Sequence, residues 1–396
     1  MIDFGNVGTL IVPEGEVAKV IRDGAMIWKR PGFEYVSLGD SIAAGHAIDD
    51  SWEKDYGYKS QYGENGNAIT EIVPGCYTDV IRGNAVKAYG ESRVTVTSYA
   101  HSGDTVADLI AKLSHETVRA AIADADMVTI CIGANDVLQA ALSNISEYIE
   151  TGSLAGIEAE IEANMAKLGD DSYPYGYKAL MDKLTAINGK AKFAFMTVYN
   201  PYKYLWLDES KNGFFAPLLA TIPDMDMFGI DIDGYIKDGL LSTPAVQTLF
   251  SRVNGLNSWT EARVSRLNDI LRSKAAAAGG NFVIADVKAA YDLVPDRPVS
   301  AEHHYNDLVN VEYTRGYDTM QMDWGALWRD EYGDNVASYW IDLATDYVSW
   351  SGLDVSGLAS ELVSQMIEKV IVPDMDPHPE PYGHEVIAST FIDALG

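Results

Sequence analysis

Hydrophobic positions change along the chain from a short alternating pattern to a regular succession of apolar runs and helical spacings. Near the N-terminus, residues 9–12 and 25–28 are apolar runs, residues 17–21 alternate, and Asp23-Gly24 separates two of these segments. Asp-Gly between alternating apolar residues is typical of a β-hairpin. We therefore predict a small β-hairpin or meander module over residues 1–31, too short to be stable alone, that packs on the body or on a partner.

From residue 32 onward, apolar runs alternate with segments of helical spacing. Residues 105–123 form a predicted helix with Asp104 available as its N-cap, and residues 259–278 form another that ends at Gly279-Gly280. The predicted strands are residues 35–38, 94–99, 127–132, 192–198 and 281–287. Near-continuous apolar strands between helices indicate a parallel sheet covered on both faces. The prediction is an α/β fold, a three-layer α/β/α sandwich that makes up residues 32–396.

Two segments, at about residues 201–255 and 296–365, interrupt this alternation and are rich in Tyr, Trp, Asp and Gly. Structureless loops of this length are uncommon in compact domains, so we predict partly helical insertions that act as lids or substrate walls. Aromatic rings with polar tips suit sugar rings, and the alternative is that they pack the insertions onto the core. The residues concerned are Tyr202, Tyr204, Trp206, Tyr305, Trp324, Trp328, Tyr332 and Trp340.

The strongly negative net charge argues against nucleic acids and anionic membranes as partners. The 396 residues carry a formal net charge of −29, which opposes binding to a phosphate backbone or to an anionic membrane. The apolar stretches fall short of the ~18 residues that span a bilayer, and the first residues lack the pattern of a signal peptide. We expect no nucleic-acid partner and no membrane insertion. Cys76 and Cys131 are too few for a disulfide framework.

Four short motifs follow predicted strands or lie near the C-terminus. Each is weak evidence alone, but their order along the chain is informative. A Gly-Asp-Ser tripeptide alone is usually a turn or a helix cap, and a lone Asn after a strand is usually a loop cap. In α/β sheets, however, ligands bind at the carboxyl ends of the strands. The motifs are Gly39-Asp40-Ser41, Ser102-Gly103-Asp104, Gly133-Ala134-Asn135-Asp136, and His378-Pro379 followed by Gly383-His384.

This joint pattern resembles the SGNH hydrolases, also called the GDSL esterase/lipase family, over roughly residues 33–200 and 256–396. The resemblance implies an SGNH/flavodoxin-like sandwich and a cofactor-free serine esterase. It implies Ser41 as nucleophile, His378 as general base, and an oxyanion hole made of the Ser41 and Gly103 backbone N–H groups and the Asn135 side chain. Glycine at position 103 lets the backbone approach a ligand closely.

The triad acid departs from the family pattern. The family places its Asp three residues before the His, and that position is Met375 here. Asp376 and Asp374 lie two and four residues before His378. Because side chains two apart in an extended strand point the same way, we favour Asp376 and keep Asp374 as the alternative.

Other candidate sites are rejected. The pair His303-His304 has no further ligand at zinc spacing, and the acidic segment 224–234 departs from the EF-hand pattern, so we predict no metal and a solvated acidic loop. No nucleotide-binding glycine motif occurs, so no cofactor is expected. We interpret His46 and His101 as surface loop histidines, with pocket lining as the alternative.

Three functions remain open. The first is a serine esterase that removes acetyl or other short acyl groups from a small-molecule or glycan ester. The second is a lipase-like or thioesterase-like enzyme for longer acyl chains. The third is a structural or binding protein, because the N-terminal meander faintly resembles β modules of phage tail-associated proteins. That resemblance implies an oligomer or assembly contact through residues 1–30 and favours an extracellular, cell-surface or virion-associated location.

Overall fold

The structure is a computed structural model of the 396-residue chain. It describes residues 32–46, 72–137, 155–205, 216–227, 230–294, 308–311 and 375–396. Four short strands within residues 11–29 and single residues or pairs at 48, 209, 338, 340, 359–360 and 363–364 are also described. No helix in these ranges is long and apolar enough to cross a membrane.

Five parallel strands form the central sheet and confirm the predicted fold class. In chain order they are β5 (Phe33–Gly39), β6 (Val94–Ser98), β7 (Met127–Cys131), β8 (Lys192–Met196) and β11 (Phe282–Ala285). The spatial order is β11-β8-β7-β5-β6, so the first strand lies between the second and the third. The chain goes from β5 to β6 on one side and then crosses to β7 on the other side of β5. The carboxyl end of β5 is therefore the topological switch point, where doubly wound sheets bind their ligands.

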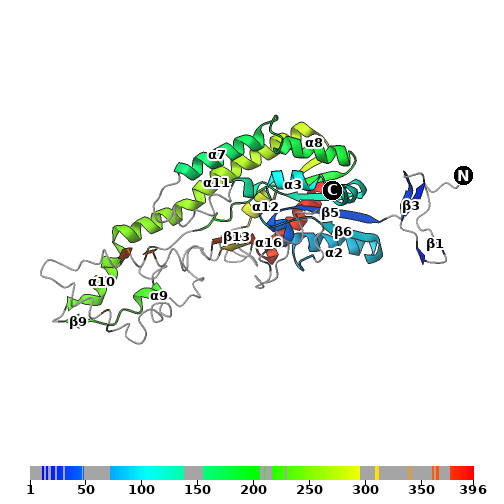
Figure 1. Cartoon of the computed structure of the whole chain (residues 1–396). Coiled ribbons are helices and arrows are strands. Elements are labelled where there is room, and N and C mark those ends of the chain that lie inside the picture. Colours follow the sequence, from blue (N-terminus) through cyan, green and yellow to red (C-terminus); the bar gives the residue numbers. More distant parts are fainter. Residues whose placement is uncertain are drawn as a thin grey trace.

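Helices cover both faces of the sheet (Figure 1). One face carries α2 (Tyr77–Tyr89) and α16 (Pro381–Leu395), with α12 (Val287–Asp292) packed against α16. The other carries α3 (Val106–Lys112), α4 (Glu116–Asp124), α7 (Ala155–Gly169), α8 (Tyr177–Ile187) and α11 (Pro244–Ala278).

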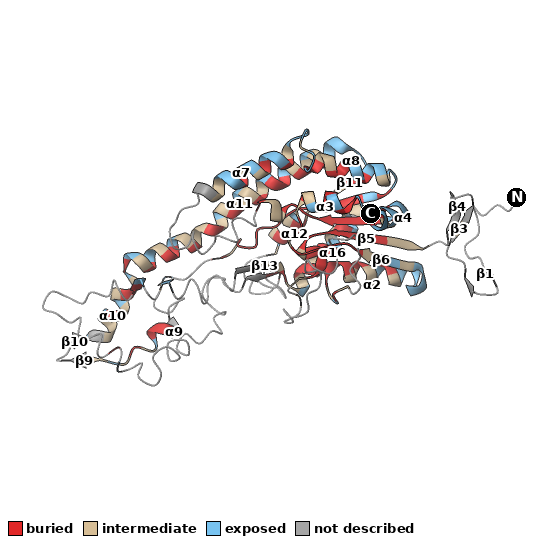
Figure 2. Ribbon diagram, in the orientation of Figure 1, coloured by how far each residue is buried: buried red, intermediate tan, exposed pale blue. Residues whose placement is uncertain are grey.

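Alternation along the strands produces two separate cores, one on each side of the sheet. Tyr35 faces the α2/α16 side, whereas Val36 and Leu38 face the α3/α8 side. Successive side chains of a strand point to opposite faces. Buried residues accordingly line the sheet and the inward faces of its helices (Figure 2).

The helix predicted over residues 105–123 is wrong in two respects. It is divided into α3 and α4, because the N–H groups of Ser114 and His115 bond to carbonyls three residues back and close the first helix. Its N-cap is Thr105 rather than Asp104. The Thr105 hydroxyl accepts from the Asp108 N–H, and the Asp108 carboxylate accepts from the Thr105 N–H, which makes a capping box.

The helix predicted at residues 259–278 begins much earlier, at Pro244. Thr243 caps it, and Pro244 stands in the first turn, where a missing N–H costs nothing. The added turns belong to the first predicted insertion, whose remaining described parts include α9 (Ala216–Leu219) and α10 (Ile232–Leu241). The long α11 runs from the sheet out to these two helices (Figure 1).

The described residues also contain a short 3₁₀ helix, η1 (Glu91–Arg93), before β6, and several two-stranded antiparallel ribbons. Strands β1 (Ile11–Val12) and β2 (Gly15–Glu16) pair, as do β3 (Lys19–Arg22) and β4 (Ala25–Lys29), which flank the predicted Asp23-Gly24 turn. Two further short strands, β9 (Asp226–Met227) and β10 (Ile230–Asp231), pair beside α10. Strand β12 (Val309–Val311) pairs with β13 (Met375–Pro379) outside the main sheet. The division into a module of residues 1–31 and a body stays a prediction.

Candidate active site

Ser41 lies at the carboxyl end of β5, as the first residue of the short helix α1 (Ser41–Ala44). The Asp40 carboxylate caps this helix by accepting from the Ile42 N–H at 3.1 Å, and the Asp40 N–H donates to the Cys131 carbonyl at 3.0 Å. Gly39 has φ of +144°, and a Cβ there would lie 2.1 Å from the Cys131 carbonyl oxygen. The close approach of β5 and β7 therefore requires the glycine of the Gly-Asp-Ser motif.

Gly103 lies in the loop that follows β6, the next strand of the sheet. Its φ of 84° is in the left-handed region that favours glycine. Two hydrogen bonds fix the loop: the His101 N–H donates to the Gly39 carbonyl at 2.9 Å, and the Asp104 N–H donates to the His101 carbonyl at 3.1 Å. The end of β6 is thus tied directly to the residue that precedes the Asp-Ser pair.

Asn135 and Asp136 follow β7 on the opposite side of β5, and both bind the Gly103 loop. The Asn135 side-chain amide donates to the Asp104 carbonyl at 3.0 Å. The Asp136 carboxylate accepts from the Val106 N–H at 2.9 Å, at the start of α3. An amide carries two N–H donors, so one donor of Asn135 holds the loop while the second can serve an oxyanion.

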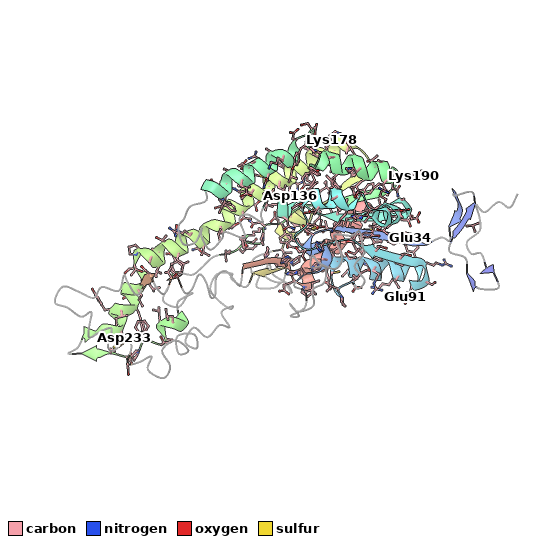
Figure 3. All side chains as sticks on the ribbon, in the orientation of Figure 1. Glu34, Glu91, Asp136, Lys178, Lys190 and Asp233 are labelled. Carbon is pink, nitrogen blue, oxygen red and sulfur yellow. The ribbon has the colours of Figure 1, made fainter. Side chains whose placement is uncertain are left out.

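Burial shifts the pKa of two carboxyl groups in these motifs, that of the buried Asp40 and that of the half-buried Asp136. Burial raises the pKa of the Asp40 carboxyl to about 7 and that of the Asp136 carboxyl to about 7. Hydrogen bonds from Ile42 and Cys131 oppose the shift at Asp40, and His378 also favours its charged form. Figure 3 shows Asp136 within the α/β body, close to the helices that cover the sheet.

His378 lies on β13, which contacts α1. Its ring centroid is 4.5 Å from that of His46, and the His46 N–H donates to the Ser41 carbonyl at 3.0 Å. The Tyr199 hydroxyl donates to the Pro377 carbonyl at 2.6 Å, which anchors the peptide just before His378. These contacts place the predicted base beside the helix that begins with the predicted nucleophile.

The second half of the C-terminal motif has a packing role. His384 is fully buried, its Nδ1 accepts from the Tyr77 N–H at 3.2 Å, and burial lowers its pKa to about 3. A Cβ at Gly383 would lie 2.0 Å from the Leu308 carbonyl oxygen. Glycine and neutral histidine therefore seat the first turn of α16 against α2 and the segment before β12.

The triad acid remains a prediction. Asp376 belongs to β13, but its side chain lies outside the described residues, as does all of Asp374.

Two histidines differ from the interpretation based on sequence. His101 is not on the surface: it is 4% exposed, and its Nδ1 lies 3.2 Å from an Asp104 carboxylate oxygen. His46 lines the site beside His378. The sequence reasoning also missed Tyr199 and Lys112. Lys112 left a signal, since it is a charged residue between the apolar positions Leu109 and Leu113 of a helix.

Three of the aromatic residues predicted in the insertions belong to the described residues. Tyr202 and Trp340 are buried, which agrees with packing onto the core, and Tyr204 is half-buried beneath the Lys203 ammonium. The others lie outside the described residues, namely Trp206, Tyr305, Trp324, Trp328 and Tyr332. In the acidic segment, Asp231 caps α10 and Asp233 pairs with Lys237 at 2.9 Å, so both carboxylates have local roles.

Comparisons with known proteins identify the family of the chain. A sequence model of the family described as GDSL-like Lipase/Acylhydrolase matches residues 35–391. No curated protein matches the chain. An extracellular lipase from Streptomyces rimosus is similar in structure, with 16% identity, a TM-score of 0.38 and coverage of 72% of this chain and 97% of that one. An acetylxylan esterase from Geobacillus stearothermophilus shares 15% identity at a TM-score of 0.35, over 92% of this chain and 94% of that one.

Proposed function

Since the chain belongs to the family of GDSL-like lipases and acylhydrolases, we propose that it removes acetyl or other short acyl groups from a carbohydrate through an acyl-enzyme at Ser41. The chain is a serine ester hydrolase. What we propose beyond that is the identity of the site residues and the class of substrate.

The observation that carries the proposal is the convergence of motifs at one edge of the sheet. Ser41, Gly103 and Asn135 follow three adjacent strands, and hydrogen bonds link their loops. His378 reaches the same edge from β13, beside α1. A nucleophile, a base and amide donors are the groups that acyl transfer requires.

The proposed reaction has two steps. The His378 imidazole takes the proton of the Ser41 hydroxyl as its oxygen attacks the ester carbonyl; the C–O bond then breaks and the alcohol leaves with that proton. Water next gives a proton to His378 as its oxygen attacks the acyl carbon. The bond from that carbon to the Ser41 oxygen then breaks, the carboxylic acid leaves, and His378 returns the proton to the Ser41 oxygen. The N–H groups of Ser41 and Gly103 and the second Asn135 donor stabilise the oxyanion in both steps.

Surface character supports a polar alcohol rather than a lipid interface. A net charge of −29 repels anionic lipid headgroups. Among the described residues, none of the exposed large hydrophobic side chains lies in the loops after β5, β6 or β7; they are Tyr89, Tyr175, Tyr235, Leu293 and Ile392. A small acyl group on a sugar needs less apolar surface than a long acyl chain.

A fluorophosphonate probe tests the nucleophile. Intact-mass spectrometry should show a single adduct on the wild type and none on Ser41→Ala. Ser102→Ala removes the neighbouring buried hydroxyl and should keep the adduct. A folded wild type without an adduct would contradict the assignment and favour a structural or binding role.

A substrate panel tests the acyl group and the alcohol. p-Nitrophenyl esters from acetate to octanoate should be cleaved with falling kcat/KM as the chain lengthens, and acetylated oligosaccharides should release acetate. A preference for octanoate would instead favour the lipase-like alternative.

A further inference from the structure

Lys112 is a buried cation directly behind the Gly103 loop. It lies in the last turn of α3, on the side of the helix that carries the core residues Leu109 and Leu113, and is 5% exposed. Its ammonium donates to the Tyr99 carbonyl at 3.1 Å and pairs with the Asp104 carboxylate. Burial lowers the pKa of Lys112, and Asp104 opposes that shift.

Asp104 connects this cation to the proposed oxyanion hole. Its carboxylate lies against Lys112 and the His101 ring, its N–H donates to the His101 carbonyl, and its own carbonyl accepts from Asn135. The residue is 4% exposed and directly follows Gly103. A shift of Asp104 would therefore move the Gly103 loop and the Asn135 amide together.

Stability alone is a weak reason for such a pair. Removing two charges from water is costly, and apolar residues of similar size often replace buried ion pairs without loss of stability. Such a pair does fix a single geometry, because an uncompensated charge left behind in the interior costs several kcal/mol.

We propose that Lys112 is a positioning residue for the oxyanion hole, which it holds in place through Asp104. The inference rests on the proposed roles of Gly103 and Asn135. Lys112 touches no reacting atom. It fixes the carboxylate of the residue whose backbone orients both donors, so its removal affects the transition state more than substrate binding.

The first test is the kinetics of Lys112→Met. Misplaced donors should lower kcat by about 10- to 100-fold while KM changes by less than about 3-fold. Lys178→Met is the matched control, because Lys178 forms an exposed pair with Asp182 at 2.6 Å and should leave kcat unchanged. Figure 3 shows Lys178 at the outer side of the body. An unchanged kcat in Lys112→Met would overturn the inference.

A double-mutant cycle with Asn135→Ala separates positioning from a general structural effect. Because part of the effect of Lys112 runs through Asn135, Lys112→Met should cost less in kcat in the Asn135→Ala background than in the wild type. An equal cost in both backgrounds would overturn the inference. If Lys112→Met fails to fold, the double variant Lys112→Met/Asp104→Asn takes its place, because it removes both charges and keeps the Asp104 carbonyl. We expect the same fall in kcat for this variant and the same dependence on Asn135.

The fluorophosphonate adduct keeps this test distinct from that of the proposed function. The adduct should form on Lys112→Met at a lower rate and reach the same end point. A wild type that forms no adduct contradicts the nucleophile, whereas a labelled wild type with an unaffected Lys112→Met contradicts only the positioning role.

Discussion

The two halves of the candidate site are built differently. On the oxyanion side, Ser41, Gly103 and Asn135 follow adjacent strands of one sheet, and backbone or amide hydrogen bonds join their loops. On the histidine side, His378 lies on a two-stranded ribbon outside that sheet. The Tyr199 hydroxyl holds the ribbon from a distant segment through the Pro377 carbonyl, and the Glu380 N–H donates to the Leu308 carbonyl at 3.0 Å at one end of the two strands.

This difference shows which half depends on the sheet and which on long-range packing. The sheet brings the proposed donors together at neighbouring strand ends, and several short contacts, including that of Lys112 with Asp104, hold their loops. The base depends on a few contacts between segments far apart in the chain, so a single lost hydrogen bond can shift it. The following predictions test this contrast, from the largest expected effect to the smallest.

Removing the central residue of either half should abolish turnover. Ser41→Ala and His378→Ala should each lower kcat by about 10⁴-fold or more, because nucleophile and base act as a unit. His46→Ala is the control within the site, since its ring lies beside His378, and we expect a loss of less than about 10-fold. Steady-state kinetics with p-nitrophenyl acetate would decide, and a His46→Ala loss as large as that of His378→Ala would exchange their roles.

Neutralising the triad acid should be nearly as severe. We expect Asp376→Asn to lower kcat by up to about 10⁴-fold and Asp374→Asn to have a mild effect, since only the orienting carboxylate fixes the imidazole tautomer. The ratio of the two kcat values is the measurement. The reverse ranking would assign the acid to Asp374.

Loss of one oxyanion donor should be smaller. Asn135→Ala should lower kcat by about 10²–10³-fold with little change in KM, because the amide acts on charge that develops in the transition state. Asn164→Ala, which removes an amide that donates to the Asp136 carbonyl at 3.0 Å, serves as control and should keep most activity. A loss confined to KM would exclude the oxyanion role.

Removal of the Tyr199 hydroxyl should lower kcat, because this hydroxyl holds the peptide next to His378. Tyr199→Phe removes the hydrogen bond to the Pro377 carbonyl and should lower kcat about 2- to 10-fold, the equivalent of one hydrogen bond. Tyr99→Phe removes a comparable bond, to the Thr117 carbonyl in α4 at 3.2 Å, and should leave kcat unchanged. Equal losses in both variants would mean that Tyr199 acts on stability alone.

The buried Asp40 should make stability depend on pH. Burial raises its pKa from 3.8 to about 7, so the folded protein keeps a proton that the unfolded chain releases near pH 4. The free energy of unfolding should therefore fall as pH rises from about 4 to 7. Asp40→Asn keeps the cap oxygen and should stabilise the protein at pH 8, by on the order of 1–4 kcal/mol, but not at pH 4.

Chemical denaturation at both pH values measures this difference. A gain from Asp40→Asn that is equal at pH 4 and pH 8 would contradict the raised pKa.

Much of the fold could be predicted, because burial on both faces leaves continuous apolar runs at the central strands. Helices were harder to place. No element was predicted at α2, where Gly83 and Asn84 interrupt the helical pattern, and α11 extends into a segment interpreted as an insertion. Local hydrogen bonds, such as those of Ser114 and His115 that divide α3 from α4, are not visible in hydrophobic spacing.

The sequence by itself determined the family and predicted which residues carry the chemistry. The motifs around Ser41, Gly103 and Asn135 follow apolar strands, and the carboxyl ends of parallel strands lie at one edge of a sheet. Only the tertiary structure decided which distant groups support them, namely Lys112 at Asp104, Tyr199 at Pro377 and His46 at His378. Contacts between remote segments, and the partner of a buried charge, depend on how the helices and loops pack. Hydrophobic periodicity and local motifs carry no information about that packing.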